Sequence, residues 1–275
     1  MESKGFIGVF DSGYGGLTIL NELRKRLPQY DYIYLGDNAR APYGNRSFDV
    51  VHDFTLEAVR FLYNKGCRLV ILACNTSSAK ALRTIQQQHL KEMDPSFRVL
   101  GVIRPSTETI GSYSKTKHIG ILGTDGTIHS NSYGIELSKF AQGTVVTQQS
   151  CPMWVPLIES NKHTSESGKA IIKEDFNSLI EKDPEIDIVL LACTHYPIIA
   201  TYLEEISDGR VKIISQGPIV AEKLKDYLNR HETLKNQISQ NSECVFLTTE
   251  KPEVFNKSAE NFLSMKVNSE QVKIS

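Results

Sequence analysis

The stretch Val70-Ile71-Leu72-Ala73-Cys74-Asn75-Thr76 has a counterpart in Val189-Leu190-Leu191-Ala192-Cys193-Thr194-His195. Each segment is an apolar run that ends in Ala-Cys and continues into hydrogen-bonding residues. Short runs rich in Val, Ile and Leu are typical of strands buried on both faces of a parallel sheet. Because such sheets bind ligands at the carboxyl ends of their strands, the repeat predicts two matching thiols, Cys74 and Cys193, facing one pocket.

Strand and helix patterns alternate along most of the chain, which predicts an α/β fold with parallel sheets covered on both faces. A strand at 6–10 leads into the glycine-rich turn 11–16, and a strand at 119–122 leads into the similar loop 123–127. In both places a cysteine follows at a similar distance along the chain. We therefore expect two related α/β halves, with a final helix over 252–263 and a polar loop over 231–243.

The amino-acid composition indicates which kinds of binding partner to expect. The 275 residues include 31 Lys and Arg against 32 Asp and Glu, so charge gives no reason to expect nucleic acid or a membrane surface, and a small molecule is the better expectation. No apolar stretch is long enough to span a membrane, and too little precedes the first strand to form a signal peptide. Five cysteines without paired spacing indicate reduced thiols in the cytoplasm.

Several candidate groups also have ordinary structural explanations. A cysteine after a strand is often only a packing residue, but the shared context and the polar residues that follow favour catalysis for Cys74 and Cys193. Asp11 and Ser12 belong either to a site or to a simple turn. His195 either polarises the Cys193 thiol or caps a helix.

The glycines after the first strand do not follow the dinucleotide-binding pattern, so no nicotinamide cofactor is expected. Paired ligand spacings such as C-x-x-C do not occur, so no metal is expected. Two further segments remain open on spacing alone. Pro42-Tyr43-Gly44 is either a turn or a carboxylate-binding loop, and Cys151–Glu159 either seals a core or contributes to a site.

Taken in series, the motifs resemble those of bacterial glutamate racemases, within the cofactor-independent aspartate/glutamate racemase superfamily. The resemblance covers nearly the whole chain, in the family's order and spacing. Its segments are Gly8–Gly13 with Gly15–Leu17, Pro42–Gly44, Ala73–Thr76, Pro156–Glu159 and Cys193–Pro197.

The resemblance implies that Cys74 and Cys193 flank the α-carbon of glutamate and exchange its proton, with Asp11 supporting the first thiol and His195 the second. By the same resemblance, Cys74 acts on D-glutamate and Cys193 on L-glutamate. Asp37 and Glu159 match supporting acids near the site. The positions implied to hold the substrate are Ser12, Pro42, Tyr43, Gly44, Asn75, Thr76, Thr124 and Thr194.

The fold implied is a pair of pseudosymmetric parallel-sheet α/β domains with the active site in the cleft between them. The first domain is expected to comprise residues 1–99 and 211–275, and the second residues 100–210. The resemblance also implies a homodimer, no cofactor and a role in supplying D-glutamate for peptidoglycan synthesis. The sequence departs from the family at Tyr14 and at Ser215-Gln216-Gly217, where Asp-Ser-Gly is expected.

Other functions remain open from the residues themselves. Glutamate and aspartate differ by one methylene group, so a racemase for another acidic amino acid such as aspartate is an alternative. A cysteine-nucleophile hydrolase would need only one essential cysteine and a histidine. A binding module for an amino acid would bind without exchanging the α-hydrogen.

Overall fold

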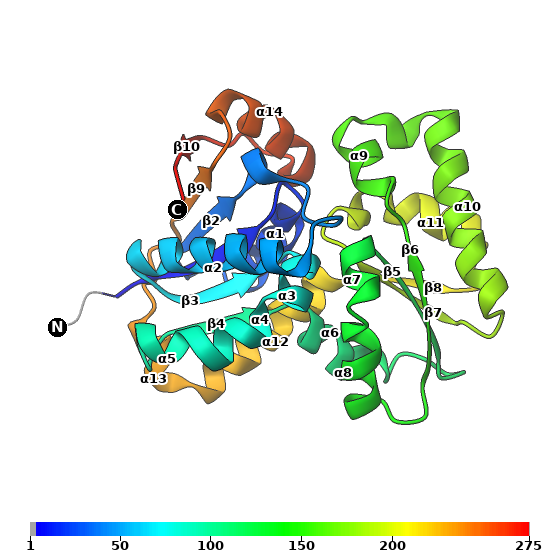
Figure 1. The fold of residues 1–275 in the computed structure, drawn as a ribbon, viewed down its shortest axis with the longest axis horizontal. Helices are drawn as coiled ribbons and strands as arrows, with labels where there is room; N and C mark the ends of the chain where they lie inside the picture. Colours follow the sequence, from blue (N-terminus) through cyan, green and yellow to red (C-terminus); the bar gives the residue numbers. More distant parts are fainter. Residues whose placement is uncertain (1–3, 275) are drawn as a thin grey trace.

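The computed structural model describes residues 4–274, which form two α/β domains (Figure 1). The larger domain contains a six-stranded sheet, and the smaller domain contains a four-stranded sheet. All neighbouring strands pair in parallel. The larger sheet has the order β10 (Ser269–Gln271), β9 (Cys244–Thr248), β2 (Tyr32–Gly36), β1 (Phe6–Asp11), β3 (Cys67–Leu72) and β4 (Arg98–Gly101). The smaller has the order β6 (Val145–Ser150), β5 (His118–Gly123), β7 (Ile188–Ala192) and β8 (Lys212–Ser215).

The two sheets share one topology. The order β2-β1-β3-β4 in the larger sheet matches β6-β5-β7-β8 in the smaller one, and β9 and β10 extend the larger sheet beyond β2. Strands β3 and β7 are therefore equivalent, and Cys74 and Cys193 follow their carboxyl ends. This arrangement confirms the predicted α/β fold with two pseudosymmetric domains.

Helices cover both faces of the larger sheet, as the buried strands require. Side chains of α1, α12 and α14 pack on one face, and those of α2 pack on the other. The helices are α1 (Gly16–Arg26), α2 (Phe48–Asn64), α3 (Asn75–Lys80), α4 (Leu82–Thr84), α5 (Leu90–Met93), α6 (Ile103–Ile110), α7 (Asp125–His129), α8 (Ser132–Phe140), α9 (Trp154–Glu159), α10 (Glu166–Lys182), α11 (Ala200–Ser207), α12 (Gln216–Arg230), α13 (Glu232–Gln237) and α14 (Pro252–Leu263). Short 3-10 turns lie at η1 (Asn38–Arg40), η3 (Lys162–Thr164) and η4 (Tyr196–Ile199), and a π-helical turn lies at η2 (Ile85–His89).

The chain passes between the domains twice, from β4 through α6 to β5 and from β8 into α12. Strand β8 pairs with β7 in the smaller sheet, although the sequence analysis assigned residues from 211 onward to the first domain. Apart from this strand, the domain limits stay a prediction. The prediction of a polar loop over 231–243 was wrong in part, because α13 forms within this segment and buries Leu234 in the core of the larger domain.

Helix α14 begins at Pro252 and ends at Leu263, as the sequence analysis expected. Within residues 4–274, no helix combines the length and the apolar character that crossing a membrane requires.

Candidate active site

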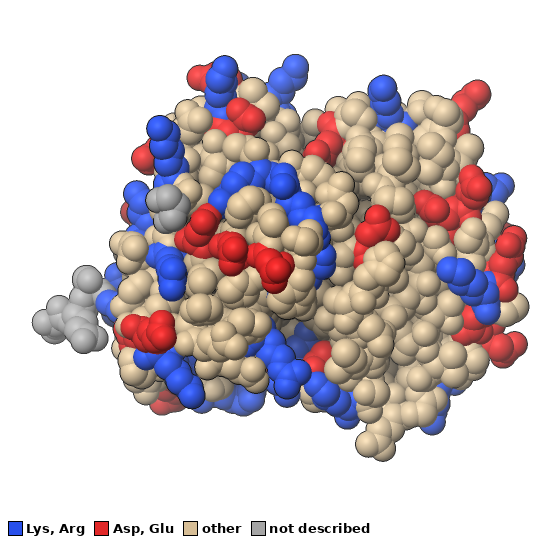
Figure 2. Space-filling view, in the orientation of Figure 1, with Lys and Arg blue, Asp and Glu red and all other residues tan. Residues whose placement is uncertain are grey.

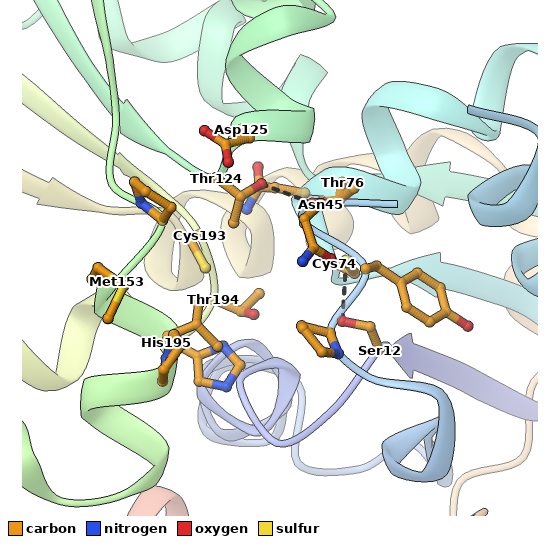
Figure 3. Close-up of a pocket in the computed structure, with 17 residues that line it drawn as sticks. Ser12, Asn45, Cys74, Thr76, Thr124, Asp125, Met153, Cys193, Thr194 and His195 are labelled. Carbon is orange, nitrogen blue, oxygen red and sulfur yellow. Dashed lines mark hydrogen bonds between the residues drawn. The ribbon is translucent and has the colours of Figure 1, made fainter. Parts of the chain in front are cut away.

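A cavity of about 320 Å³ lies between the domains, and both Cys74 and Cys193 line it. A hollow separates the two lobes in the space-filling view (Figure 2). Figure 3 shows the two cysteines on opposite sides of the open space. The other lining residues are Ser12, Pro42, Tyr43, Gly44, Asn45, Asn75, Thr76, Thr124, Asp125, Pro152, Met153, Val155, Pro156, Thr194 and His195.

The Cys74 side chain lies between β3 and α3 and caps the helix. The Ser77 backbone N–H donates to its Sγ at 3.5 Å, and the thiol donates to Ser12 Oγ at 3.6 Å. Burial and the nearby Asp11 carboxylate raise the pKa of the Cys74 thiol to about 11, although hydrogen bonding with Ser77 and Ser12 opposes the shift. Cys74 is therefore a protonated thiol at neutral pH.

On the other side of the cavity, Cys193 is accompanied by His195. Glu159 Oε1 lies 2.9 Å from His195 Nε2. Burial alone would lower the pKa of His195, but its hydrogen bonds to Cys193 and Glu159 outweigh burial and raise it to about 10. His195 is therefore an imidazolium at neutral pH, a positive charge beside the Cys193 sulfur.

Asp11 is fully buried at the carboxyl end of β1. Its Oδ2 accepts from the Gly13 N–H at 2.9 Å, and its Oδ1 accepts from the Thr194 hydroxyl at 3.2 Å. Burial raises the pKa of Asp11, while the charge of His195 and these hydrogen bonds limit the shift. The hydrogen bonds of Asp11 thus link the first strand to the Cys193 side of the cavity.

The backbone at the start of α1 also lies close to the Cys193 side of the cavity. A Cβ on Gly15 would lie 2.3 Å from Thr194 Oγ1 and 2.4 Å from His195 Nδ1, which real structures do not tolerate. The Thr18 hydroxyl also donates to the Thr194 carbonyl at 3.0 Å. Glycine at position 15 is needed because α1 of the larger domain packs directly on the Thr194-His195 segment.

A cluster of threonine hydroxyls joins the domains at another part of the cavity. Thr76 Oγ1 and Thr124 Oγ1 are 3.0 Å apart (Figure 3). Both are also within hydrogen-bond distance of Thr127 Oγ1. Thr124 caps α7 by accepting from the Thr127 N–H. Hydroxyls can donate or accept, so the cluster offers adaptable partners for a polar ligand.

The hydroxyl of Tyr43 is already engaged. Tyr43 lines the cavity, but its O–H donates to the buried carboxylate of Asp37. Arg40 Nε also donates to Asp37 at 2.7 Å, and Thr249 Oγ1 donates to it at 2.9 Å. In this structure the Tyr43 hydroxyl therefore pairs with a charged acceptor of the protein, and the substrate-holding role implied for Tyr43 stays a prediction.

Most of the predicted site residues lie together. Cys74, Cys193 and His195 and all eight predicted substrate positions line the cavity. The acids Asp11, Asp37 and Glu159 are not among its lining residues, but each is hydrogen-bonded to a residue that is. The predicted catalytic and binding roles of these residues stay predictions.

For the segment 151–159 the sequence analysis left two roles open, sealing a core or contributing to a site, and its residues divide between the core and the cavity. Its residues Pro152, Met153, Val155 and Pro156 line the cavity. Trp154 is fully buried instead, and its indole N–H donates to Asp175 at 2.8 Å. The alternation is possible because successive side chains point in different directions around the short helix α9.

Asn45 and Asp125 are cavity residues that the sequence analysis did not identify. Each is the direct neighbour of a predicted position, Gly44 or Thr124, and that adjacency was the only available signal.

Comparison with known proteins gives consistent results over the whole chain. The family model described as Asp/Glu/Hydantoin racemase matches residues 17–224. The glutamate racemase of Streptococcus agalactiae serotype III is 34% identical over 266 residues, which are 97% of each chain.

Among solved structures, a glutamate racemase isoform from Bacillus anthracis has a TM-score of 0.89 at 32% identity, covering 98% of this chain and 97% of that one. The glutamate racemase of Francisella tularensis, solved in complex with D-glutamate, has a TM-score of 0.84 at 31% identity, covering 98% of each chain. This chain therefore belongs to the Asp/Glu/hydantoin racemase family of isomerases.

Proposed function

We propose that this protein is a glutamate racemase that interconverts L- and D-glutamate by proton transfer between Cys74 and Cys193. The observation that carries the proposal is that equivalent strands of two related domains bring one thiol each to a single cavity. Inversion at a tetrahedral carbon needs an acid and a base on opposite faces, and this arrangement supplies them. The relatives named glutamate racemase, and the D-glutamate complex of one of them, support glutamate as the substrate.

The protonation states suggest how the reaction begins with L-glutamate. His195 lies on the Cys193 side of the cavity, and Cys74 is a thiol because burial raises its pKa. The Cys193 thiolate takes the α-proton, the C–H electron pair remains on carbon, and the Cys74 S–H delivers a proton to the opposite face. The reverse reaction uses the same two groups with exchanged roles, so Cys74 acts on D-glutamate.

The carbanion formed between these steps needs stabilisation by the protein. Negative charge grows on the α-carboxylate as the proton leaves, and preorganised donors around that group lower the barrier. The hydroxyls of Ser12, Thr76, Thr124 and Thr194 line the cavity, and we assign them to the substrate as donors to the two carboxylates and as acceptors from the ammonium. No chemistry beyond proton transfer is required of the chain's own residues.

Deuterium incorporation tests the two-base scheme. With L-glutamate in heavy water, early D-glutamate should carry deuterium at the α-carbon while unreacted L-glutamate keeps its hydrogen, because the thiol that takes the proton is not the thiol that returns one. Deuterium in the remaining substrate before product forms would instead indicate a single base.

Substitution of each thiol is the matched genetic test. Cys74→Ser and Cys193→Ser should each lower kcat/KM by at least about 100-fold, the usual contribution of a positioned acid or base. The enantiomers have equal free energy, so the loss must be the same in both directions. Cys244→Ser, at a cysteine outside the cavity, is the control.

The same variants discriminate the alternatives. Parental racemisation by Cys74→Ser would refute the scheme, and turnover of an ester or amide by that variant would favour a cysteine hydrolase. A higher kcat/KM for aspartate than for glutamate would redirect the substrate assignment. Binding of glutamate without any α-hydrogen exchange would indicate a binding protein.

We also propose that the D-glutamate supplies peptidoglycan synthesis, that the protein acts in the cytoplasm and that it assembles as a homodimer, each from the resemblance to the family. Sedimentation equilibrium measures the assembly, and a monomer at working concentrations would refute it. Depletion of the protein in its host should create a requirement for added D-glutamate.

A further inference from the structure

Three side chains beside the cavity form a closed ring of hydrogen bonds. Asn75 Nδ2 donates to Gln216 Oε1 at 2.7 Å, Gln216 Nε2 donates to the Tyr133 hydroxyl at 2.7 Å, and that hydroxyl donates to Asn75 Oδ1 at 2.6 Å. All three residues are at most 3% exposed. Each group donates to the next in the same direction, so the bonds polarise and strengthen one another.

The surroundings of Gln216 determine the direction of the ring. Its Nε2 also lies 3.3 Å from the Val102 carbonyl and 2.9 Å from Ser106 Oγ. A carbonyl only accepts, so the amide nitrogen of Gln216 must face Val102, and its Oε1 must face Asn75. The orientation of Asn75 follows, because only its Nδ2 can donate to that oxygen.

The ring therefore fixes the orientation of the Asn75 side-chain amide, and with it the hydrogen-bonding group that Asn75 has left for a ligand in the cavity. One N–H of its amide is used by Gln216, and its Oδ1 accepts from Tyr133. Within the described residues 4–274, the second N–H of Asn75 has no protein acceptor. Asn75 directly follows Cys74 in the chain, and both residues line the same cavity.

The ring also joins residues of the two domains. Asn75 begins α3 of the larger domain, whereas Tyr133 lies on α8 of the smaller domain. Gln216 begins α12, where the chain returns to the larger domain, and its amide contacts Val102 and Ser106 at the first crossing. The ring can close only when the two domains hold their present separation.

We propose that Gln216 and Tyr133 are positioning residues, which hold the free N–H of Asn75 toward a carboxylate of the substrate when the domains are closed. This inference rests on the proposed racemase function. Neither Gln216 nor Tyr133 lines the cavity, so both act through Asn75. The ring makes Asn75 a donor before the anionic substrate arrives, which removes the cost of reorienting its amide.

The test compares Tyr133→Phe, Gln216→Met and Asn75→Ala with Ser106→Ala. Tyr133→Phe removes one hydroxyl and so opens the ring of hydrogen bonds, but it keeps the packed aromatic side chain, so the protein should fold. We expect Tyr133→Phe and Gln216→Met each to raise KM for glutamate about tenfold with a smaller change in kcat, because loss of one oriented hydrogen bond has that size. Ser106→Ala leaves the ring intact and should keep the parental KM.

A double-mutant cycle separates positioning from general destabilisation. In the Asn75→Ala background, Tyr133→Phe should cause no further loss of kcat/KM, since the group through which it acts is absent. An equal loss in both backgrounds, or a parental KM in both Tyr133→Phe and Gln216→Met, would overturn the inference. The parent protein serves as the separate check, because its failure to racemise glutamate would refute the proposed function instead.

Discussion

At the scale of single residues, two acids outside the cavity contact side chains that line it, the buried Asp11 and the more exposed Glu159. Asp11 bonds to Thr194, and Glu159 lies against His195. Burial raises the pKa of Asp11 and so disfavours its carboxylate, whereas Glu159 helps to keep His195 charged.

Replacing Glu159 should change the pH dependence of the reaction. Glu159→Gln removes one of the two interactions that raise the pKa of His195 to about 10, so the imidazolium should be lost at a lower pH. We expect the alkaline decline of kcat/KM to begin at lower pH than in the parent. The measurement is kcat/KM as a function of pH, from neutral pH to about pH 11, for both proteins. An alkaline decline at the same pH in the two proteins would contradict the prediction.

Replacing Asp11 should raise stability and lower activity together. The folded-state pKa of Asp11 is above its ordinary value, so the stability that this group contributes is fully present below about pH 4 and is lost as pH rises through the folded pKa. Asp11→Asn carries no charge; its Oδ1 can accept from the Gly13 N–H, and its Nδ2 can donate to the Thr194 hydroxyl, which then accepts instead of donating. It should therefore melt at a higher temperature than the parent at neutral pH.

The advantage of Asp11→Asn should shrink as the pH falls to about 4 and below, because Asp11 of the parent then becomes protonated in the unfolded as well as in the folded state. Thermal unfolding at the two pH values provides the comparison, with racemase assays alongside. A lower melting temperature of Asp11→Asn at neutral pH would show that the carboxylate stabilises the fold.

At the scale of elements, the contact between α1 and the segment after β7 places the larger domain against the Cys193 side of the cavity. The contact depends on Gly15, whose missing Cβ leaves room for Thr194 and His195. Gly15→Ala should cost about 1–3 kcal/mol of stability through overpacking and should lower kcat/KM by about tenfold or more.

Gly13→Ala is the matched control for Gly15→Ala. A Cβ at position 13 would meet its nearest atom, Glu159 Oε1, at an ordinary 3.6 Å. The backbone N–H of residue 13 would still donate to Asp11. Chemical denaturation and steady-state kinetics measure both variants, and equal effects at positions 13 and 15 would contradict the role assigned to the close approach.

At the scale of the whole molecule, the cavity is shared between two domains, so a bound ligand should hold them together. Glutamate at about 100 times its Kd should stabilise the folded protein by about 2.7 kcal/mol, because it binds only the folded state. The Cys74→Ser variant avoids turnover during the measurement. Thermal melts with glutamate should show the increase, and glutamine at the same concentration is the control.

The absence of a melting shift at glutamate concentrations that saturate the activity of the parent would contradict ligand binding between the domains. A shift that persists with glutamine would show that the carboxylate at the end of the side chain is not recognised.

Local patterns in the sequence were sufficient to predict the strands, the pairing of two halves and the meeting of Cys74 and Cys193 at one cavity. The runs 70–74 and 189–193 identified equivalent strands because burial on both faces demands continuous apolar residues. The resemblance to racemase motifs implied Ser12, Thr76 and Thr194 as substrate positions, and all three line the cavity.

Other features depend on contacts between residues far apart in the chain, and only the tertiary structure decided them. The Tyr43 hydroxyl turns to Asp37, and strand β8 joins the smaller sheet through its pairing with β7. Gln216 was visible as a departure from the expected Asp-Ser-Gly, but its bond to Asn75 joins side chains 141 positions apart. Periodicity and spacing report on neighbours along the chain, whereas the partner of a buried polar group is set by whichever acceptor or donor the packed domains bring next to it.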